Sequence, residues 1–86
     1  MAESSFTLRF FASLRERLGT GEEQLPADDI ACVGDVLEQL RQRGSEWAEL
    51  LHSDHVLMAV NQAMAREGTP VQPGDEVAFF PPVTGG

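Results

Sequence analysis

The sequence contains no lysine, and its six basic residues are all arginines, set against fourteen acidic residues for a formal net charge of −8. This excess of negative charge argues against a nucleic-acid partner, because the phosphate backbone would be repelled and not neutralised. A basic protein surface is a better partner, although an acidic solubilising surface explains the same charge. The missing lysines leave the chain no ε-amine to join to an activated carboxyl end of its own, an absence that biased genome composition could also produce.

Cysteine and long apolar runs are also scarce. The single cysteine, Cys32, excludes an internal disulfide framework and fits a reducing compartment. No apolar run approaches the roughly 18 residues of a membrane span, and residues 1–5 do not resemble a signal peptide. We therefore expect a cytoplasmic protein with no membrane segment. Its 86 residues, 42% of them hydrophobic, are expected to form one small domain.

Hydrophobic periodicity predicts an α+β domain. Phe6, Leu8 and Phe10 alternate with other residues as in a strand with one face on a core, which leaves Phe11 on the opposite face. Further strands are predicted over 22–25, 56–60, 63–66 and 76–80, with a turn at Asn61-Gln62. A helical turn is predicted over 14–18, ending at Gly19, and an amphipathic helix from Val33 to Arg43, with Gly44 just past its end. A short helix over 45–51 is predicted to have Ser45 as its N-cap.

The carboxyl end of the chain differs from the rest. Pro81 and Pro82 must stop the last strand, because each lacks a backbone N–H and fixes φ. Residues 81–86 therefore form an extended tail of roughly 20 Å after a domain over 1–80. Gly85 and Gly86 carry no side chain, so the end of this tail can enter a narrow channel. A frayed terminus is the plain alternative.

A terminal glycine offers one reactive group, its α-carboxyl. This group is ionised at neutral pH and is a poor electrophile, so it needs activation before it can react. Attachment to AMP would make the carboxyl of Gly86 a mixed anhydride, and displacement by a sulfur nucleophile would leave a thiocarboxylate. A thiocarboxylate presents sulfur as a nucleophile on a long arm.

Residues 74–86, with the sequence GDEVAFFPPVTGG, resemble the carboxyl end of the small subunit of molybdopterin synthase, a ubiquitin-like sulfur carrier. Residues 10–12 with Arg15-Glu16, and Ala59-Val60-Asn61-Gln62, match the same family. The resemblance implies a β-grasp fold, in which a mixed sheet clasps one main helix and an extended tail follows. It also implies that the first and last strands lie side by side and parallel in the centre of the sheet.

The resemblance implies a function as well. An adenylyltransferase of the ubiquitin-activating type would adenylate Gly86, and a sulfur donor protein would supply the thiocarboxylate sulfur. The carrier would then pass this sulfur to a cyclic pyranopterin precursor in the large synthase subunit, within a heterotetramer. No tightly bound cofactor is implied, and the catalytic residues are expected in the large subunit. The residues that would thread the tail are Pro81, Pro82, Val83, Thr84 and Gly85.

The main candidates for a partner interface are Phe11, Arg15 and Phe80. Only one of Phe79 and Phe80 can face the core, and the other is expected to join Phe11 in an exposed apolar patch, unless it packs under the tail. Arg15 matches a basic position of the family and could pair with an acidic partner residue, or be a solubilising charge. Asp75-Glu76 could contact a basic activating enzyme or simply shape the turn.

Other functions stay open at this point. A related carrier could feed sulfur to the thiazole of thiamine or to tRNA, and an inert ubiquitin-like binding module would ignore the tail. Cys32 with His52 or His55 could be a nucleophile and base, although a semi-buried thiol at a helix N-cap is favoured. The run His52-Ser53-Asp54-His55 could supply half of a metal site, but no second ligand cluster accompanies it, so we expect a solvated loop and no metal.

Overall fold

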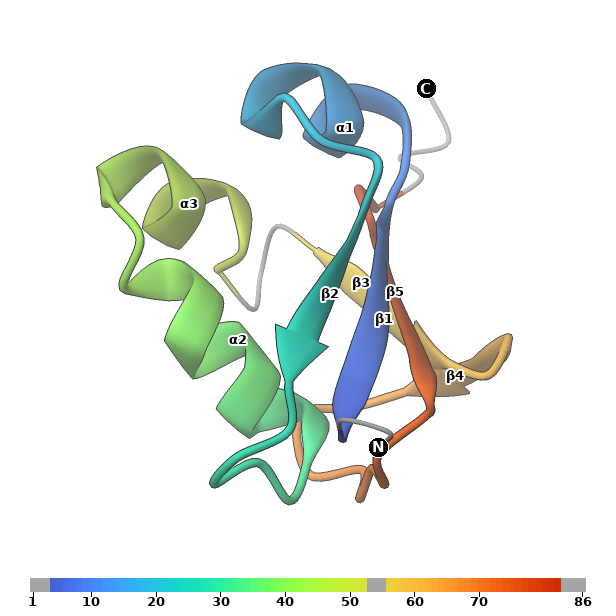
Figure 1. The fold of residues 1–86 in the computed structure, drawn as a ribbon. Helices are drawn as coiled ribbons and strands as arrows, with labels where there is room; N and C mark the ends of the chain where they lie inside the picture. Colours follow the sequence, from blue (N-terminus) through green and yellow to red (C-terminus); the bar gives the residue numbers. More distant parts are fainter. Residues whose placement is uncertain (1–3, 53–55, 83–86) are drawn as a thin grey trace.

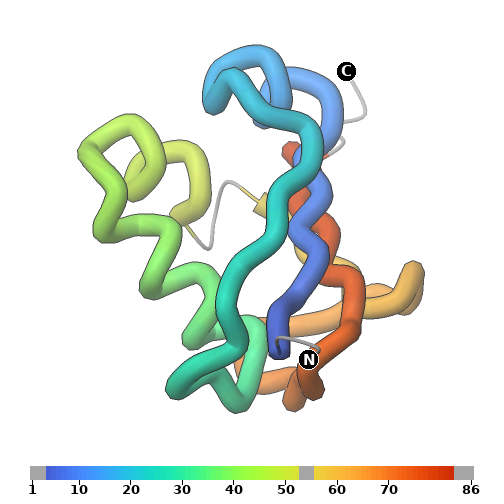
Figure 2. The backbone as a smooth tube through the Cα atoms, viewed as in Figure 1, coloured from blue at the N-terminus to red at the C-terminus, as the bar shows by residue number. Residues whose placement is uncertain are grey.

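The computed structural model of the protein describes residues 4–52 and 56–82. Helices α2 and α3 pack on one face of a twisted sheet, and α1 lies at the end of the sheet where β1 finishes (Figures 1 and 2). The elements are β1 (Ser5–Phe10), α1 (Ala12–Leu18), β2 (Glu22–Pro26), α2 (Val33–Arg41), α3 (Ser45–Leu50), β3 (Leu57–Val60), β4 (Ala63–Ala65) and β5 (Glu76–Phe80).

The sheet has the strand order β2-β1-β5-β3-β4. The first and last strands are parallel neighbours, with Leu8 opposite Val77 and Phe10 opposite Phe79. The other neighbouring pairs are antiparallel. The predicted β-grasp arrangement is therefore confirmed, and the strand that carries the tail is hydrogen-bonded on both sides.

The core lies between the sheet and α2, as the period-2 pattern predicts. Phe6, Leu8 and Phe10 of β1 are buried, and so are Val77 and Phe79 of β5. The rings of Phe10 and Phe79 stack with centroids 5.6 Å apart. Burying each such side chain contributes about 1.5–3 kcal/mol. The apolar stripe of α2 that covers them consists of Val33, Val36, Leu37 and Leu40.

Two predicted helix ends are wrong. Helix α2 ends at Arg41 and not at Arg43, because the backbone N–H of Arg43 donates to the carbonyl of Leu40 (3.1 Å), three residues back, which tightens the last turn. Gly44 serves as the N-cap of α3, and Ser45 is the first residue of that helix and not its cap. Once outside the helix, the Arg43 guanidinium lies over the Trp47 ring, 4.6 Å from its centroid. This contact ties the α2–α3 connection to α3.

The start of α2 confirms the prediction for Cys32, which is the half-buried N-cap residue. Cys32 and Asp35 form a reciprocal capping box. The Asp35 carboxylate accepts the backbone N–H of Ala31 at 2.9 Å and that of Cys32 at 3.3 Å. The hydrogen bond from Ala31 is the largest of the effects that hold the pKa of Asp35 below its ordinary value of 3.8, and burial opposes it. Ionised Asp35 therefore stabilises the helix start.

Replacing Asp35 with asparagine is expected to lower the melting temperature in a pH-dependent way. The pKa of Asp35 is lower in the folded state than in the unfolded state, so its contribution is fully present above pH 3.8 and is lost as the pH falls below that value. Thermal unfolding of wild type and Asp35→Asn at about pH 7 and about pH 2.5 tests this. A difference in melting temperature that is equally large at both pH values would contradict it.

Candidate functional site

The candidate site is the face of the sheet opposite the core. In the described part of the chain, the helices pack on the other face, so the outward side chains here form a surface (Figure 1). The strand registers place residues that are far apart in sequence side by side. Ala78 of β5 lies between Arg9 of β1 and Ala59 of β3, and Met64 of β4 lies beyond Ala59.

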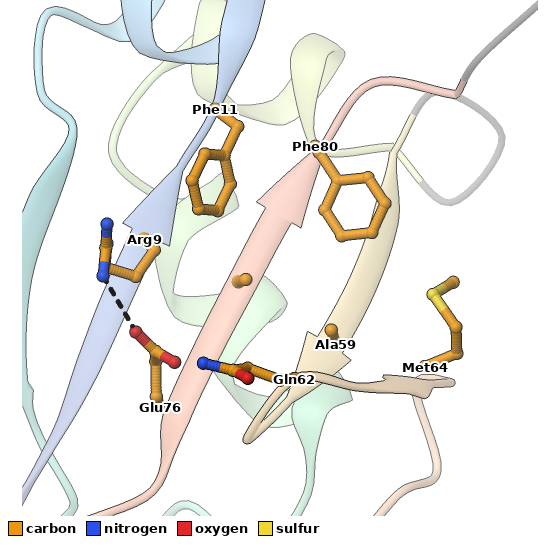
Figure 3. A pocket seen from close by; sticks show the side chains of 8 residues that line it. Arg9, Phe11, Ala59, Gln62, Met64, Glu76 and Phe80 are labelled. Atoms are coloured by element: carbon orange, nitrogen blue, oxygen red, sulfur yellow. Dashed lines mark hydrogen bonds and ion pairs between the residues drawn. The ribbon is translucent and has the colours of Figure 1, made fainter.

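A hollow of about 380 Å³ opens on this face. Ala59 and Ala78, which are paired across β3 and β5, form its floor, because their side chains end at Cβ. Phe11, Phe80 and Met64 rise around this floor (Figure 3). Phe11 is 42% exposed and Met64 67% exposed, which is unusual for large apolar side chains in one small area. The apolar part of the open face is therefore a candidate docking surface.

One end of the hollow is polar. Arg9 donates through Nη1 to Oε2 of Glu76 at 3.0 Å, and its Nε lies 3.9 Å from Oε1 of Glu22. The Arg9 guanidinium also lies 5.4 Å from the centroid of the Phe11 ring, so it joins the charged end to the aromatic wall. Gln62 reaches from the β3–β4 turn toward Glu76 (Figure 3).

Asn61 fixes the position of Glu76. Its side-chain oxygen accepts the backbone N–H of Glu76 at 3.0 Å, and its own backbone N–H donates to the carbonyl of Glu76 at 2.8 Å. Asn61 and Gln62 both have positive φ, 50° and 72°, as a tight hairpin turn requires, so the predicted turn is confirmed. Asp75 accepts the backbone N–H of Gln72 at 2.9 Å and thus shapes the turn before β5.

The tail begins at the aromatic end of the hollow. Strand β5 ends at Phe80, and half-buried Pro81 and exposed Pro82 follow, so the predicted stop is confirmed. Phe11 follows the last residue of the neighbouring strand β1, and its backbone N–H donates to the carbonyl of Phe79 at 3.1 Å. The four tail residues Val83, Thr84, Gly85 and Gly86 lie outside the described residues, and their predicted roles stay predictions.

The structure brings together two of the three residues proposed for the partner interface. Phe11 and Phe80 both line the hollow, whereas Phe79 is fully buried on the core side, as the alternation predicts. Arg15 is exposed on α1, outside the hollow, with its side chain against Gly21. Its role toward a partner stays a prediction.

The alternative Cys/His site gains no support from the fold. Cys32 begins α2, whereas His52 follows α3, past the other end of α2, and His55 lies outside the described residues. Within residues 4–52 and 56–82, no group of three or more His, Cys, Asp or Glu side chains could hold a metal ion. Over the same residues, no helix is both long and apolar enough to cross a membrane.

Sequence reasoning missed most of the hollow. Arg9 lies two residues before Phe11, and Ala78 lies two residues before Phe80. Because side chains two residues apart in a strand point to the same face, both could have been placed on the open face. Ala59, Gln62 and Met64 could not, because their position beside β5 depends on the register of β3 and β4.

Known proteins resemble this chain over nearly its whole length. The molybdopterin synthase sulfur carrier subunit of Haemophilus influenzae is 47% identical over 77 residues, which cover 90% of this chain and 94% of that protein. The small archaeal modifier protein 3 of Haloferax volcanii is 38% identical over 88 residues, covering 92% of this chain and 96% of that protein.

A Haloferax volcanii protein solved in solution has the same fold, with a TM-score of 0.81 and 36% identity over 96% of this chain and 87% of that one. The resemblance seen in the tail and the early segment thus extends over nearly the whole chain. The model of the ThiS family matches residues 8–86, a range that includes the final two glycines. The chain belongs to the ThiS family.

Proposed function

We propose that this chain is the sulfur carrier subunit of a molybdopterin synthase. The observation that carries the proposal is its 47% identity to a carrier subunit of that name, together with a family match that runs to Gly86. The fold supports it, because the strand that leads into the tail is held on both sides by β1 and β3. Such a strand gives the tail a fixed base.

The proposed reaction takes place at the carboxyl group of Gly86. A carboxylate oxygen attacks the α-phosphorus of ATP on a partner adenylyltransferase, which forms the acyl-adenylate and releases pyrophosphate. A sulfur donor protein then supplies sulfur at the oxidation level of sulfide, which attacks the carbonyl carbon, displaces AMP and leaves a thiocarboxylate. The thiocarboxylate sulfur bonds to a carbon of the cyclic pyranopterin precursor and displaces an oxygen substituent from it. Water then hydrolyses the resulting thioester, so that the sulfur stays on the pterin and Gly86 returns to a carboxylate. Because these steps use ATP, we propose that they occur in the cytoplasm.

The large synthase subunit is the proposed partner in the last step, in a heterotetramer. The apolar part of the open face, with Phe11 and Phe80, would dock on it, and Arg15 on neighbouring α1 would contact its edge. Pro81, Pro82, Val83, Thr84 and Gly85 would lead Gly86 into its active site. As the family resemblance implies, the catalytic groups are proposed to belong to the large subunit.

Intact-mass spectrometry tests the proposal directly. The chain is incubated with its adenylyltransferase, ATP and a sulfur donor, and the expected result is a mass gain equal to the exchange of one oxygen for sulfur. The sulfurated chain should then convert the pterin precursor when the large subunit is added. Sulfuration without conversion would instead favour a carrier for the thiamine thiazole or for tRNA. Absence of sulfuration under these conditions would contradict both.

Protein modification is a second candidate function, because a relative named as a modifier protein is 38% identical over almost its full length. An activated Gly86 would then form an amide with a lysine of another protein. This chain has no lysine of its own, so side-chain-linked chains of it could not grow. Each acceptor lysine should therefore carry a single copy, which mass spectrometry of conjugates from cells can test.

A further inference from the structure

We infer that the hollow on the open face receives a basic side chain, an arginine or a lysine, from the large subunit. The inference deepens the proposed function and rests on it, since that function supplies the partner. Shape, charge and rigidity of the described residues each support it.

The shape of the hollow suits a long, unbranched side chain. Its floor is the alanine pair Ala59 and Ala78, and its walls are Phe11 and Phe80 on one side and Met64 on the other (Figure 3). Arginine and lysine bury their methylene stems along apolar surfaces of this kind and keep their charge at a polar end. The polar end is present here, at Glu76 and Gln62.

The charge at this end favours a cation. Glu22 and Glu76 place two carboxylates around the single guanidinium of Arg9, so this group of three carries a net negative charge. Arg9 contacts Oε2 of Glu76, and a carboxylate has about four acceptor sites, so Glu76 can accept a second donor. The net charge of −8 on the whole chain steers basic surfaces toward it.

Glu76 is also held in place before a partner binds. Asn61 binds both backbone polar groups of Glu76, so the backbone of Glu76 is fixed at the polar end of the hollow. A site that is already ordered loses little conformational entropy on binding. An acidic side chain would fit poorly, because the cation of Arg9 is already paired with the two carboxylates.

Binding of the large subunit to charge variants tests the inference, with the dissociation constant measured by titration calorimetry at low and high salt. Glu76→Gln is expected to weaken binding by about 10-fold or more and to reduce its salt dependence. Arg9→Gln is expected to strengthen binding several-fold, because it removes the cation that competes for Glu76. Glu38→Gln is the matched control, since it changes the net charge equally from the exposed side of α2, on the other face of the sheet, and should alter affinity less than about twofold.

A second variant keeps the test informative if Glu76→Gln disturbs the turn before β5. Ala78→Leu fills the floor of the hollow without changing charge, and it should weaken binding by about 10-fold. Wild-type affinity in both Glu76→Gln and Ala78→Leu, or weaker binding by Arg9→Gln, would overturn the inference while leaving the proposed function intact. No binding of the large subunit by wild type would instead overturn the proposed function and the inference with it.

Discussion

Removal of Gly85 and Gly86 is expected to abolish sulfur loading and to leave the fold unchanged. The shortened chain would end at Thr84, whose branched side chain crowds the carboxyl group and prevents the close approach that two glycines allow. A misplaced reacting group of this kind lowers the rate by about 100-fold or more. Intact-mass spectrometry after incubation with the activating enzyme, ATP and sulfur donor measures the loss.

Thr84→Ser is the matched control for this truncation, because it changes the tail but keeps both glycines. It should load sulfur at close to the wild-type rate. Thermal unfolding of all three chains should agree within a few degrees, since the core residues lie in other parts of the chain. A truncated chain that still gains sulfur, or that restores cofactor synthesis in cells lacking the natural chain, would overturn the proposed role of Gly86.

Alanine substitutions at Phe79 and Phe80 are expected to separate stability from binding. Phe79 is fully buried against Phe10, and Phe79→Ala should lower the free energy of unfolding by about 3–5 kcal/mol. Phe80 points to the opposite face and lines the hollow, so Phe80→Ala should cost little stability. It should weaken binding of the large subunit by about 30-fold or more, as loss of an aromatic anchor does.

Denaturant unfolding and titration calorimetry on the two variants measure these effects. Arg66→Ala is a useful control for the binding experiment, because Arg66 follows β4 and is exposed outside the hollow. If Phe80→Ala binds as tightly as wild type while Arg66→Ala does not, the docking surface lies elsewhere on the domain. The apolar patch would then be packing under the tail.

Local chemistry in the sequence predicted the elements of this fold well. Alternation in β1 and β5 identified the buried residues, Pro81 and Pro82 ended β5, and Gly19 ended α1 in the left-handed conformation. These features depend on backbone geometry and on residues close together in the chain. The end of α2 was less predictable, because both Arg41 and Arg43 suit a last helical turn.

The sequence by itself determined which residues face the core and where the tail begins, because a period-2 pattern and a proline act within a few residues of the chain. Only the tertiary structure decided what the open face contains. Arg9 meets Glu76 across 67 residues of chain, and Ala59 meets Ala78, solely because β5 inserts between β1 and β3 in one register. A shift of that register by one residue would turn these side chains to the other face. The residues of β3 and β4 alone do not indicate which register these strands adopt beside β5.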